Sequence, residues 1–147
     1  VVATSPVSLG CDLELVETRS RLFVRDYFTP AEQAWVADRI DQHSLWANLI
    51  WSAKESALKV LREGLRRDTR SVEVCFNGDV AGPWRSFVVD DVDGDRFTGW
   101  WQQFGQFVLT VCADHPIDPP EALTDPSPLI TAVPGHSWME GLPGRRG

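Results

Sequence analysis

The sequence lacks any long uninterrupted apolar run, and no basic stretch followed by an apolar segment stands at its start. A membrane-spanning helix needs about 20 consecutive apolar residues, so we expect neither a membrane span, nor a secretory signal, nor a membrane partner. A cytoplasmic protein is the resulting expectation. No internal repeat is visible, and 147 residues, 43% of them hydrophobic, are enough to bury one sizeable core.

Cysteine is scarce, and its pattern excludes the usual metal and disulfide frameworks. The chain has an odd number of cysteines without C-x-x-C spacing: Cys11, Cys75 and Cys112. Each stands in an apolar, strand-like context, which predicts reduced core residues. The three histidines stand in loops or at a helix end, and we assign none of them a catalytic role: His43, His115 and His136.

Positive charge is deficient overall, but the deficit belongs to one half of the chain. The net charge is −7; residues 1–70 hold ten Lys/Arg and ten Asp/Glu, whereas residues 71–147 hold four and eleven. No basic cluster is interleaved with aromatic residues, so nucleic acid is not an expected partner. The first half is the more basic and therefore the better suited to an anionic ligand.

Helix signals concentrate in the first half of the chain. Thr29 is a good N-cap, the proline after it suits the first helical position, and Glu32 completes a capping box. These residues predict a helix over residues 30–43. Ser44 can cap a second, long amphipathic helix whose apolar spacing continues to about Gly64.

Strand-like runs dominate the second half and predict an antiparallel meander. Strands are expected at residues 72–76, 85–89 and 104–112, after an N-terminal strand over residues 1–16 and a short helix over residues 18–27. The expected fold is α+β, with the long helix packed on a small antiparallel sheet. We place one domain at residues 1–113. Seven of the ten prolines follow it, so residues 114–147 are interpreted as a proline-rich tail or wrapping arm.

Two charged segments are the most informative feature of the chain. In Gly10-Cys11-Asp12-Leu13-Glu14, strand alternation places the two acids on one face. In Trp51-Ser52-Ala53-Lys54-Glu55-Ser56-Ala57-Leu58-Lys59, Glu55 and Lys59 are four apart and therefore neighbours on a helix. Each pair alone is typical of a solvated surface. Together they supply three carboxylates and two lysines for a metal-assisted phosphoryl site.

The ordered pattern G-x-D-x-E, then F-[ST]-x-x-E at Phe28-Thr29-Pro30-Ala31-Glu32, then W-S-x-K-E-S-x-x-K resembles the signature of the phosphopantetheinyl transferase superfamily. The resemblance runs from about Val7 to Val74. Three ordered elements at such distances arise by chance far less often than any one of them. The motif wording is closest to the surfactin-synthetase-activating type or to domains fused to polyketide synthases.

The resemblance implies transfer of the phosphopantetheine arm of coenzyme A to a serine of an acyl or peptidyl carrier protein, with release of adenosine 3′,5′-bisphosphate. By the same resemblance Asp12, Glu14 and Glu55 hold Mg²⁺, which prefers hard oxygen ligands. Lys54 and Lys59 bind coenzyme A; Lys59 offsets charge on its leaving phosphate, and Lys54 does the same or protonates that phosphate. Glu55 doubles as the base for the serine proton. The alternatives are an inactive docking or assembly module of the same fold and a Mg²⁺-dependent phosphohydrolase.

A basic segment follows the first motif and resembles the family's carrier-docking helix. Its charges are Arg19, Arg21 and Arg25, with Leu22 and Phe23 beside them. Charges of this sign would steer an acidic carrier protein, and the apolar residues would contribute burial. The alternative is an ordinary surface helix with salt bridges to neighbouring acids.

The chain holds one copy of a unit that larger family members of the surfactin-synthetase-activating type contain twice. Single-copy members of the holo-acyl-carrier-protein synthase type build three sites at the interfaces of a trimer. The resemblance therefore implies a homo-oligomer, with a trimer favoured, or membership in a larger synthase chain. Tryptophans are candidates for apolar edges that a second copy covers, the alternative being that they fill the core of their own chain: Trp35, Trp84, Trp100 and Trp101.

Overall fold

The computed structural model describes residues 6–135, the side chain of residue 65 excepted, and it confirms the α+β prediction. A long helix packs against one antiparallel sheet, whose strand order is β1-β6-β5-β4-β2 with β3 paired to β4. The helices and strands are β1 (Leu9–Leu15), α1 (Arg21–Tyr27), α2 (Pro30–Ala37), α3 (His43–Val60), β2 (Val72–Cys75), β3 (Val80–Ala81), β4 (Trp84–Asp91), β5 (Arg96–Phe104), β6 (Phe107–Ala113) and α4 (Ser127–Thr131). Short 3-10 turns lie at Ile40–Gln42, Gly64–Arg66 and Thr69–Ser71.

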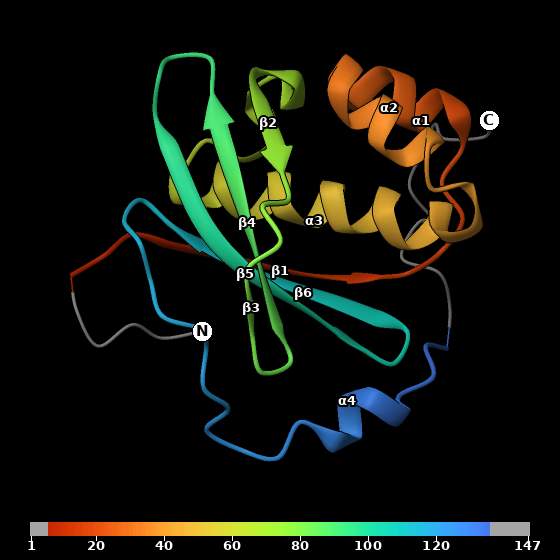
Figure 1. Ribbon diagram of the computed structural model, residues 1–147, viewed down its shortest axis with the longest axis vertical. Coiled ribbons are helices and arrows are strands. Elements are labelled where there is room, and N and C mark those ends of the chain that lie inside the picture. The colour runs from red at the N-terminus through yellow and green to blue at the C-terminus, as the bar shows by residue number, and fades with distance from the viewer. Residues whose placement is uncertain (1–5, 136–147) are drawn as a thin grey trace.

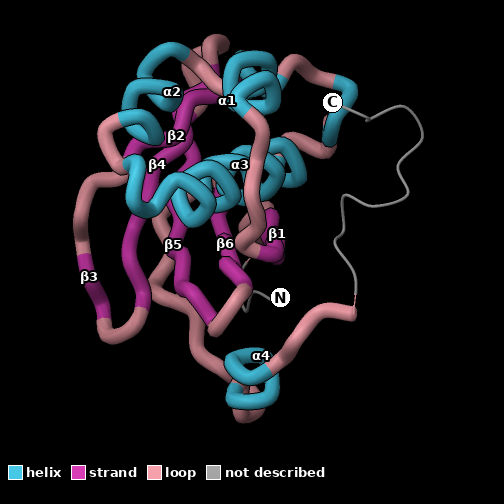
Figure 2. Tube along the Cα trace, turned by 90° about the vertical axis from the view of Figure 1, so that its right-hand side faces the viewer, coloured by secondary structure: helices cyan, strands magenta, loops and turns pink. Residues whose placement is uncertain are grey.

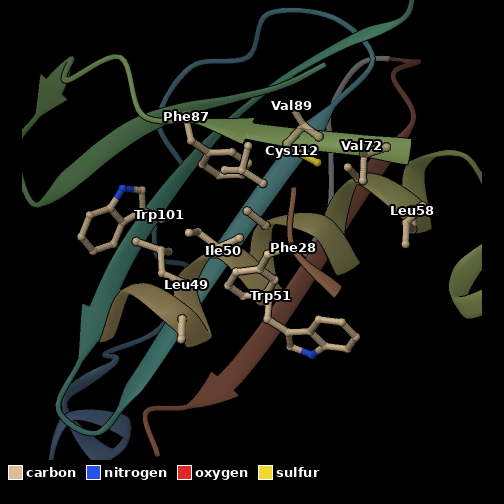
Figure 3. Close-up of a cluster of buried hydrophobic side chains, with 14 of the residues drawn as sticks. Phe28, Leu49, Ile50, Trp51, Leu58, Val72, Phe87, Val89, Trp101 and Cys112 are labelled. Carbon is tan, nitrogen blue, oxygen red and sulfur yellow. The ribbon is translucent and has the colours of Figure 1, made fainter. Parts of the chain in front are cut away.

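The long helix α3 lies across the strands in both views (Figures 1 and 2). Its inner side packs against the sheet through fully buried side chains such as Leu49, Ile50 and Leu58. Figure 3 shows these side chains in a buried hydrophobic cluster that also contains Phe87 and Val89 of β4. Each such side chain contributes about 1.5–3 kcal/mol by leaving water, so this contact fixes α3 on the sheet.

Several helix boundaries differ from the predicted ones: α1 begins at Arg21 instead of residue 18, and α3 ends at Val60 instead of near Gly64. The capping box of Thr29 and Glu32 forms as predicted, with both reciprocal hydrogen bonds present. However, α2 ends at Ala37 because the backbone turns away from helical geometry at Arg39 (φ −123°, ψ 49°). Ser44 caps nothing, since α3 already begins one residue before it.

The strand β5 was not among the predicted elements, although it lies in the middle of the sheet. Its inward residues Phe97, Gly99 and Trp101 do alternate along the strand. The pattern is hidden in the sequence because Trp100, an outward residue, is as apolar as its inward neighbour. Large aromatic residues on both faces therefore conceal a strand from a test based on alternation.

The tryptophans expected to form uncovered edges are largely covered within the chain. Trp84 and Trp101 are less than a tenth exposed. The ring of Trp35 packs against Trp46, and the indole N–H of Trp100 donates to the Ile117 carbonyl at 2.8 Å. Trp84 and Trp101 therefore fill the core of their own chain, whereas Trp35 and Trp100 are only partly buried, and these contacts give no support to a second copy.

The segment after β6 follows the side of the sheet that faces away from α3. The hydroxyl of Thr98 donates to the His115 carbonyl at 3.3 Å, and the carbonyl of Ile130 sits against Gly105 at the β5–β6 turn. It then passes around the end of the molecule opposite α1 and α2, where α4 lies (Figure 1). Residues 136–147 of the expected tail, with His136, lie outside the described residues.

The cysteines are free thiols in the described part of the chain, but they are not uniformly core residues. Cys112 is fully buried, and burial raises the pKa of its thiol to about 12. Cys75 is exposed on the edge strand β2, contrary to the prediction. Among residues 6–135, no helix is both long enough and apolar enough to cross a membrane.

Candidate functional site

The strand β1 and the helix α3 bring four of the predicted site residues together. Asp12 and Glu14 face α3, as the strand alternation predicts, and Glu55 and Lys59 lie one turn apart on the helix. The Lys59 Nζ atom donates to Asp12 Oδ1 at 2.7 Å and to the Cys11 carbonyl at 2.9 Å. The site is therefore a strand-and-helix seam that holds three acids and one base.

Two carboxylates of this cluster, Glu14 and Glu55, have raised pKa values. Burial, followed by repulsion from Asp12, raises the pKa of Glu14 to about 7, although the Arg19 guanidinium lies 3.2 Å away and opposes the shift. Burial and repulsion from Asp12 also raise the pKa of Glu55, against the pull of Lys59. A cation placed among these groups would relieve both the repulsion and the desolvation.

Two oxygens of this cluster fit a divalent cation. In the described part of the chain, Asp12 Oδ2 and Glu55 Oε1 are buried and lack any hydrogen-bond partner. A buried carboxylate oxygen without a donor is costly, and it is the ligand type that Mg²⁺ prefers. Among residues 6–135 no three acidic, histidine or cysteine side chains are yet gathered closely enough to enclose an ion, so binding requires the side chains to converge.

Three hydroxyl groups that the sequence did not indicate form a buried hydrogen-bond network, which holds α3 against β1 and β6 at the site. The hydroxyl of Thr110 lies 2.9 Å from that of Ser52 and 2.6 Å from that of Ser56. Thr110 is paired with Asp12 across β1 and β6, and Ser52 also donates to the Asp12 carbonyl at 3.3 Å. Both serines stand inside the W-S-x-K-E-S motif, which is the signal that could have revealed their positioning role.

Gly10, the glycine of G-x-D-x-E, allows β1 to approach α3. A Cβ atom added there would lie 1.9 Å from the Ser56 carbonyl oxygen. That oxygen belongs to the backbone of α3, so no rotamer change can relieve the clash. The glycine therefore sets the distance between the strand that carries Asp12 and the helix that carries Glu55.

We expect Gly10→Ala to destabilise the protein by about 2–3 kcal/mol and to weaken Mg²⁺ binding, because β1 must move away from α3. Urea unfolding and a calorimetric Mg²⁺ titration measure the two effects. Gly135→Ala is the matched control, since no atom of residues 6–134 lies within 4 Å of the Cβ that it adds. Equal stability of the two variants would contradict this account of the close approach.

Lys54 does not lie with the acidic residues and Lys59 at the contact between β1 and α3. Its ammonium is fully buried on another side of α3, 2.8 Å from the Glu32 carboxylate, and it donates to the carbonyls of Thr69 (2.7 Å) and Val72 (2.6 Å). It cannot contact a coenzyme A diphosphate at Lys59 without leaving that pair. The prediction that Lys54 binds coenzyme A and assists its leaving phosphate therefore disagrees with the structure.

The three arginines predicted to dock a carrier protein do not form one surface. Arg19 precedes α1, is 5% exposed, and donates to Asn48 Oδ1 at 2.7 Å as well as to Glu14. Phe23 is likewise buried in the core. Arg21 and Arg25 are exposed on α1 beside Leu22, which is 52% exposed. Arg19 thus orients a site carboxylate instead of meeting a partner.

A family model described as the 4′-phosphopantetheinyl transferase superfamily matches residues 8–112. The match extends from the start of β1 almost to the end of β6, and it includes every residue of the acidic cluster. The chain belongs to this superfamily. Members of this class are transferases that take phosphopantetheine from coenzyme A and act on carrier proteins, typically with a divalent metal. No curated protein matches the chain.

Proposed function

We propose that the protein is a Mg²⁺-dependent holo-carrier-protein synthase, which transfers the phosphopantetheine arm of coenzyme A to a serine of an apo acyl or peptidyl carrier protein. The observation that carries the proposal is the pair of unpartnered buried oxygens, Asp12 Oδ2 and Glu55 Oε1, beside the ammonium of Lys59. Carboxylates that repel one another and lack donors are suited to a hard cation, and the family chemistry supplies a diphosphate to share it.

The chain's own residues then have separate tasks. Asp12, Glu14 and Glu55 would hold Mg²⁺, which supplies charge neutralisation at the diphosphate. Glu55 accepts the proton of the carrier serine, and burial together with repulsion from Asp12 raises its pKa, which makes it a stronger base than an exposed glutamate. The serine oxygen forms a bond to the phosphorus that bears the pantetheine arm, and the bond from that phosphorus to the bridging oxygen breaks. Lys59 offsets the charge that the departing bisphosphate gains.

Arg21, Leu22 and Arg25 remain candidates for carrier docking. They share the exposed side of α1, directly after the strand that carries the site acids. Arg25 already pairs with Asp26 at 2.8 Å, so an acidic partner would have to compete with that neighbour. Arg19 is excluded from this surface by its burial.

We also propose that this unit works next to a second unit. The second unit is either another copy in a homo-oligomer, with a trimer favoured over a dimer, or a neighbouring part of a larger synthase chain. This proposal is supported by the sequence, which holds one copy of G-x-D-x-E and of W-S-x-K-E-S-x-x-K. The tryptophans do not support it. Exposed apolar side chains are scattered over separate elements, as Ile40 at 69%, Val80 at 65% and Val92 at 73% show. They define no single interface.

One assay tests the activity. The protein is incubated with coenzyme A, Mg²⁺ and a panel of apo carrier proteins, and the carriers are then weighed by intact mass spectrometry. A mass gain equal to the phosphopantetheine arm supports transfer. Free adenosine 3′,5′-bisphosphate without a carrier gain indicates a phosphohydrolase, and neither product indicates a docking module; both results contradict the proposal.

The metal site should bind more tightly as pH rises through neutrality. Glu14, with a pKa near 7, must lose its proton before its carboxylate can bind a cation. Between pH 6 and pH 8 we therefore expect Mg²⁺ affinity to rise about tenfold, with proton release on binding. Calorimetric titrations in two buffers of different ionisation heat measure both quantities. An affinity that stays flat over this range would exclude Glu14 as a ligand.

A further inference from the structure

A buried arginine holds one carboxylate of the acidic cluster in place. The Arg19 Nη2 atom donates to Glu14 Oε2 at 3.2 Å, and the Arg19 side chain is 3% exposed. The side chain of Trp51, the first residue of the W-S-x-K-E-S motif, hydrogen-bonds the same carboxylate. Two donors from different parts of the chain therefore hold Glu14, which cannot rotate as freely as a glutamate on the surface.

The guanidinium of Arg19 is itself oriented by Asn48, a fully buried residue of α3. Arg19 Nε donates to Asn48 Oδ1 at 2.7 Å. The Asn48 amide nitrogen donates to the carbonyls of Glu17 (2.6 Å) and Ser44 (2.7 Å). Because only one orientation of the amide makes all three bonds, the direction of its oxygen is fixed. The Phe23 ring also lies against the guanidinium, with its centre 4.8 Å from the central carbon.

Stability alone does not account for a positive charge at this position. A buried guanidinium loses its hydration, and a well-packed apolar residue in the place of a buried ion pair is often equally stable or more so. The charge does change what Glu14 offers to a ligand. A cation that approaches Oε2 meets the guanidinium 3.2 Å from that oxygen, and the two positive charges repel each other. At most one oxygen of Glu14, Oε1, is therefore available to a metal ion.

The number of oxygens that a carboxylate offers affects which cation it prefers. Mg²⁺ is small, requires near-ideal octahedral geometry and keeps several of its waters. Ca²⁺ is larger, takes about six to eight oxygen ligands and accepts both oxygens of one carboxylate. A glutamate restricted to one oxygen therefore favours Mg²⁺, whereas a glutamate that is free to turn both oxygens to the ion favours Ca²⁺.

We infer that Arg19, oriented by Asn48, restricts Glu14 to a single coordinating oxygen and thereby gives the site its preference for Mg²⁺ over Ca²⁺. The inference concerns the metal site of the proposed function and rests on that proposal. Arg19 acts through Glu14, so it is a positioning residue and not a ligand. Both Arg19 and Asn48 lie outside the three sequence motifs, so the motifs alone do not show this determinant.

The test compares the affinities of the full chain for Mg²⁺ and Ca²⁺, measured by calorimetric titration and by the rise in melting temperature that each cation produces. Arg19→Gln removes the charge but retains an amide beside Asn48. The ratio of Mg²⁺ affinity to Ca²⁺ affinity should fall about tenfold in this variant. Asn48→Ala keeps the charge but frees the guanidinium, and it should move the ratio in the same direction by less. Arg19→Lys, which returns a positive charge beside Glu14, should recover most of the preference for Mg²⁺.

Arg96→Gln is the matched control, because it also removes an arginine from an ion pair, here the pair with Asp90 at 2.6 Å between β4 and β5. It should leave the ratio unchanged. An unchanged ratio in Arg19→Gln, or an equal loss of affinity for both cations, would overturn the inference, because a purely structural role predicts no change in preference. An Arg19→Lys protein as unselective as Arg19→Gln would overturn it too, since the charge would then have no effect.

The same proteins separate this inference from the proposed function. If the wild-type protein modifies carriers while the ratio in Arg19→Gln is unchanged, the inference alone fails. If the wild-type protein modifies none but Arg19→Gln lowers the ratio, the proposed function alone fails. A wild-type protein that binds neither cation would contradict both.

Discussion

Asp12→Ala should reduce phosphopantetheine transfer by a factor of about 10³ or more while the protein stays folded. Asp12 is the centre of the acidic cluster, because it raises the pKa of both Glu14 and Glu55 and accepts the Lys59 ammonium. Its removal takes away a metal ligand and leaves the lysine without its partner. No apolar core contact is lost, since the side chain faces the seam between β1 and α3.

The loss is measured as carrier modification at saturating Mg²⁺, with circular dichroism and urea unfolding as checks on the fold. Asp118→Ala is the matched control, since Asp118 is an exposed aspartate in the segment after β6. It should transfer at the wild-type rate. Wild-type turnover by Asp12→Ala would remove Asp12 from the site and, with it, the metal assignment. A second expected sign is a lower pKa for Glu14, because one repelling charge has gone.

The sequence predicted the acidic seam well because its signals are local. Strand alternation places Asp12 and Glu14 on one face, and a spacing of four places Glu55 and Lys59 on one helix face; the structure keeps both placements. The distance between the two faces is not a local property. It depends on the backbone approach at Gly10 and on the buried hydroxyl of Thr110, which comes from a strand 98 residues beyond Asp12.

The misassigned residues share one cause, which is that neighbours in sequence were treated as neighbours in space. Lys54 adjoins Glu55 in the chain, but successive residues of a helix point about 100° apart, so the two side chains face different surroundings. Arg19 was grouped with the helix that follows it, yet it lies before the Ser20 N-cap and folds back on Glu14. Neither residue type nor spacing shows which way such a side chain turns.

Lys54→Met should destabilise the protein by about 3–5 kcal/mol, the range found when one partner of a buried ion pair is removed. Burial lowers the pKa of Lys54 and raises that of Glu32, so each depends on the other to stay charged. The pair is fully hydrogen-bonded: the Glu32 carboxylate also accepts from the backbone N–H of Thr29 and of Val74. It ties α2 and α3 to the edge strand β2.

Lys59→Met is the matched control, because the same substitution five residues along α3 removes a half-exposed ammonium. It should lose transfer and keep its stability, whereas the folded fraction of Lys54→Met should keep its turnover. The double variant Glu32→Gln/Lys54→Met should recover part of the lost stability, since no unpaired charge stays buried. Urea unfolding together with turnover per folded molecule measures all three. A normally stable Lys54→Met protein without turnover would return Lys54 to the catalytic group and contradict the structural role that its burial implies.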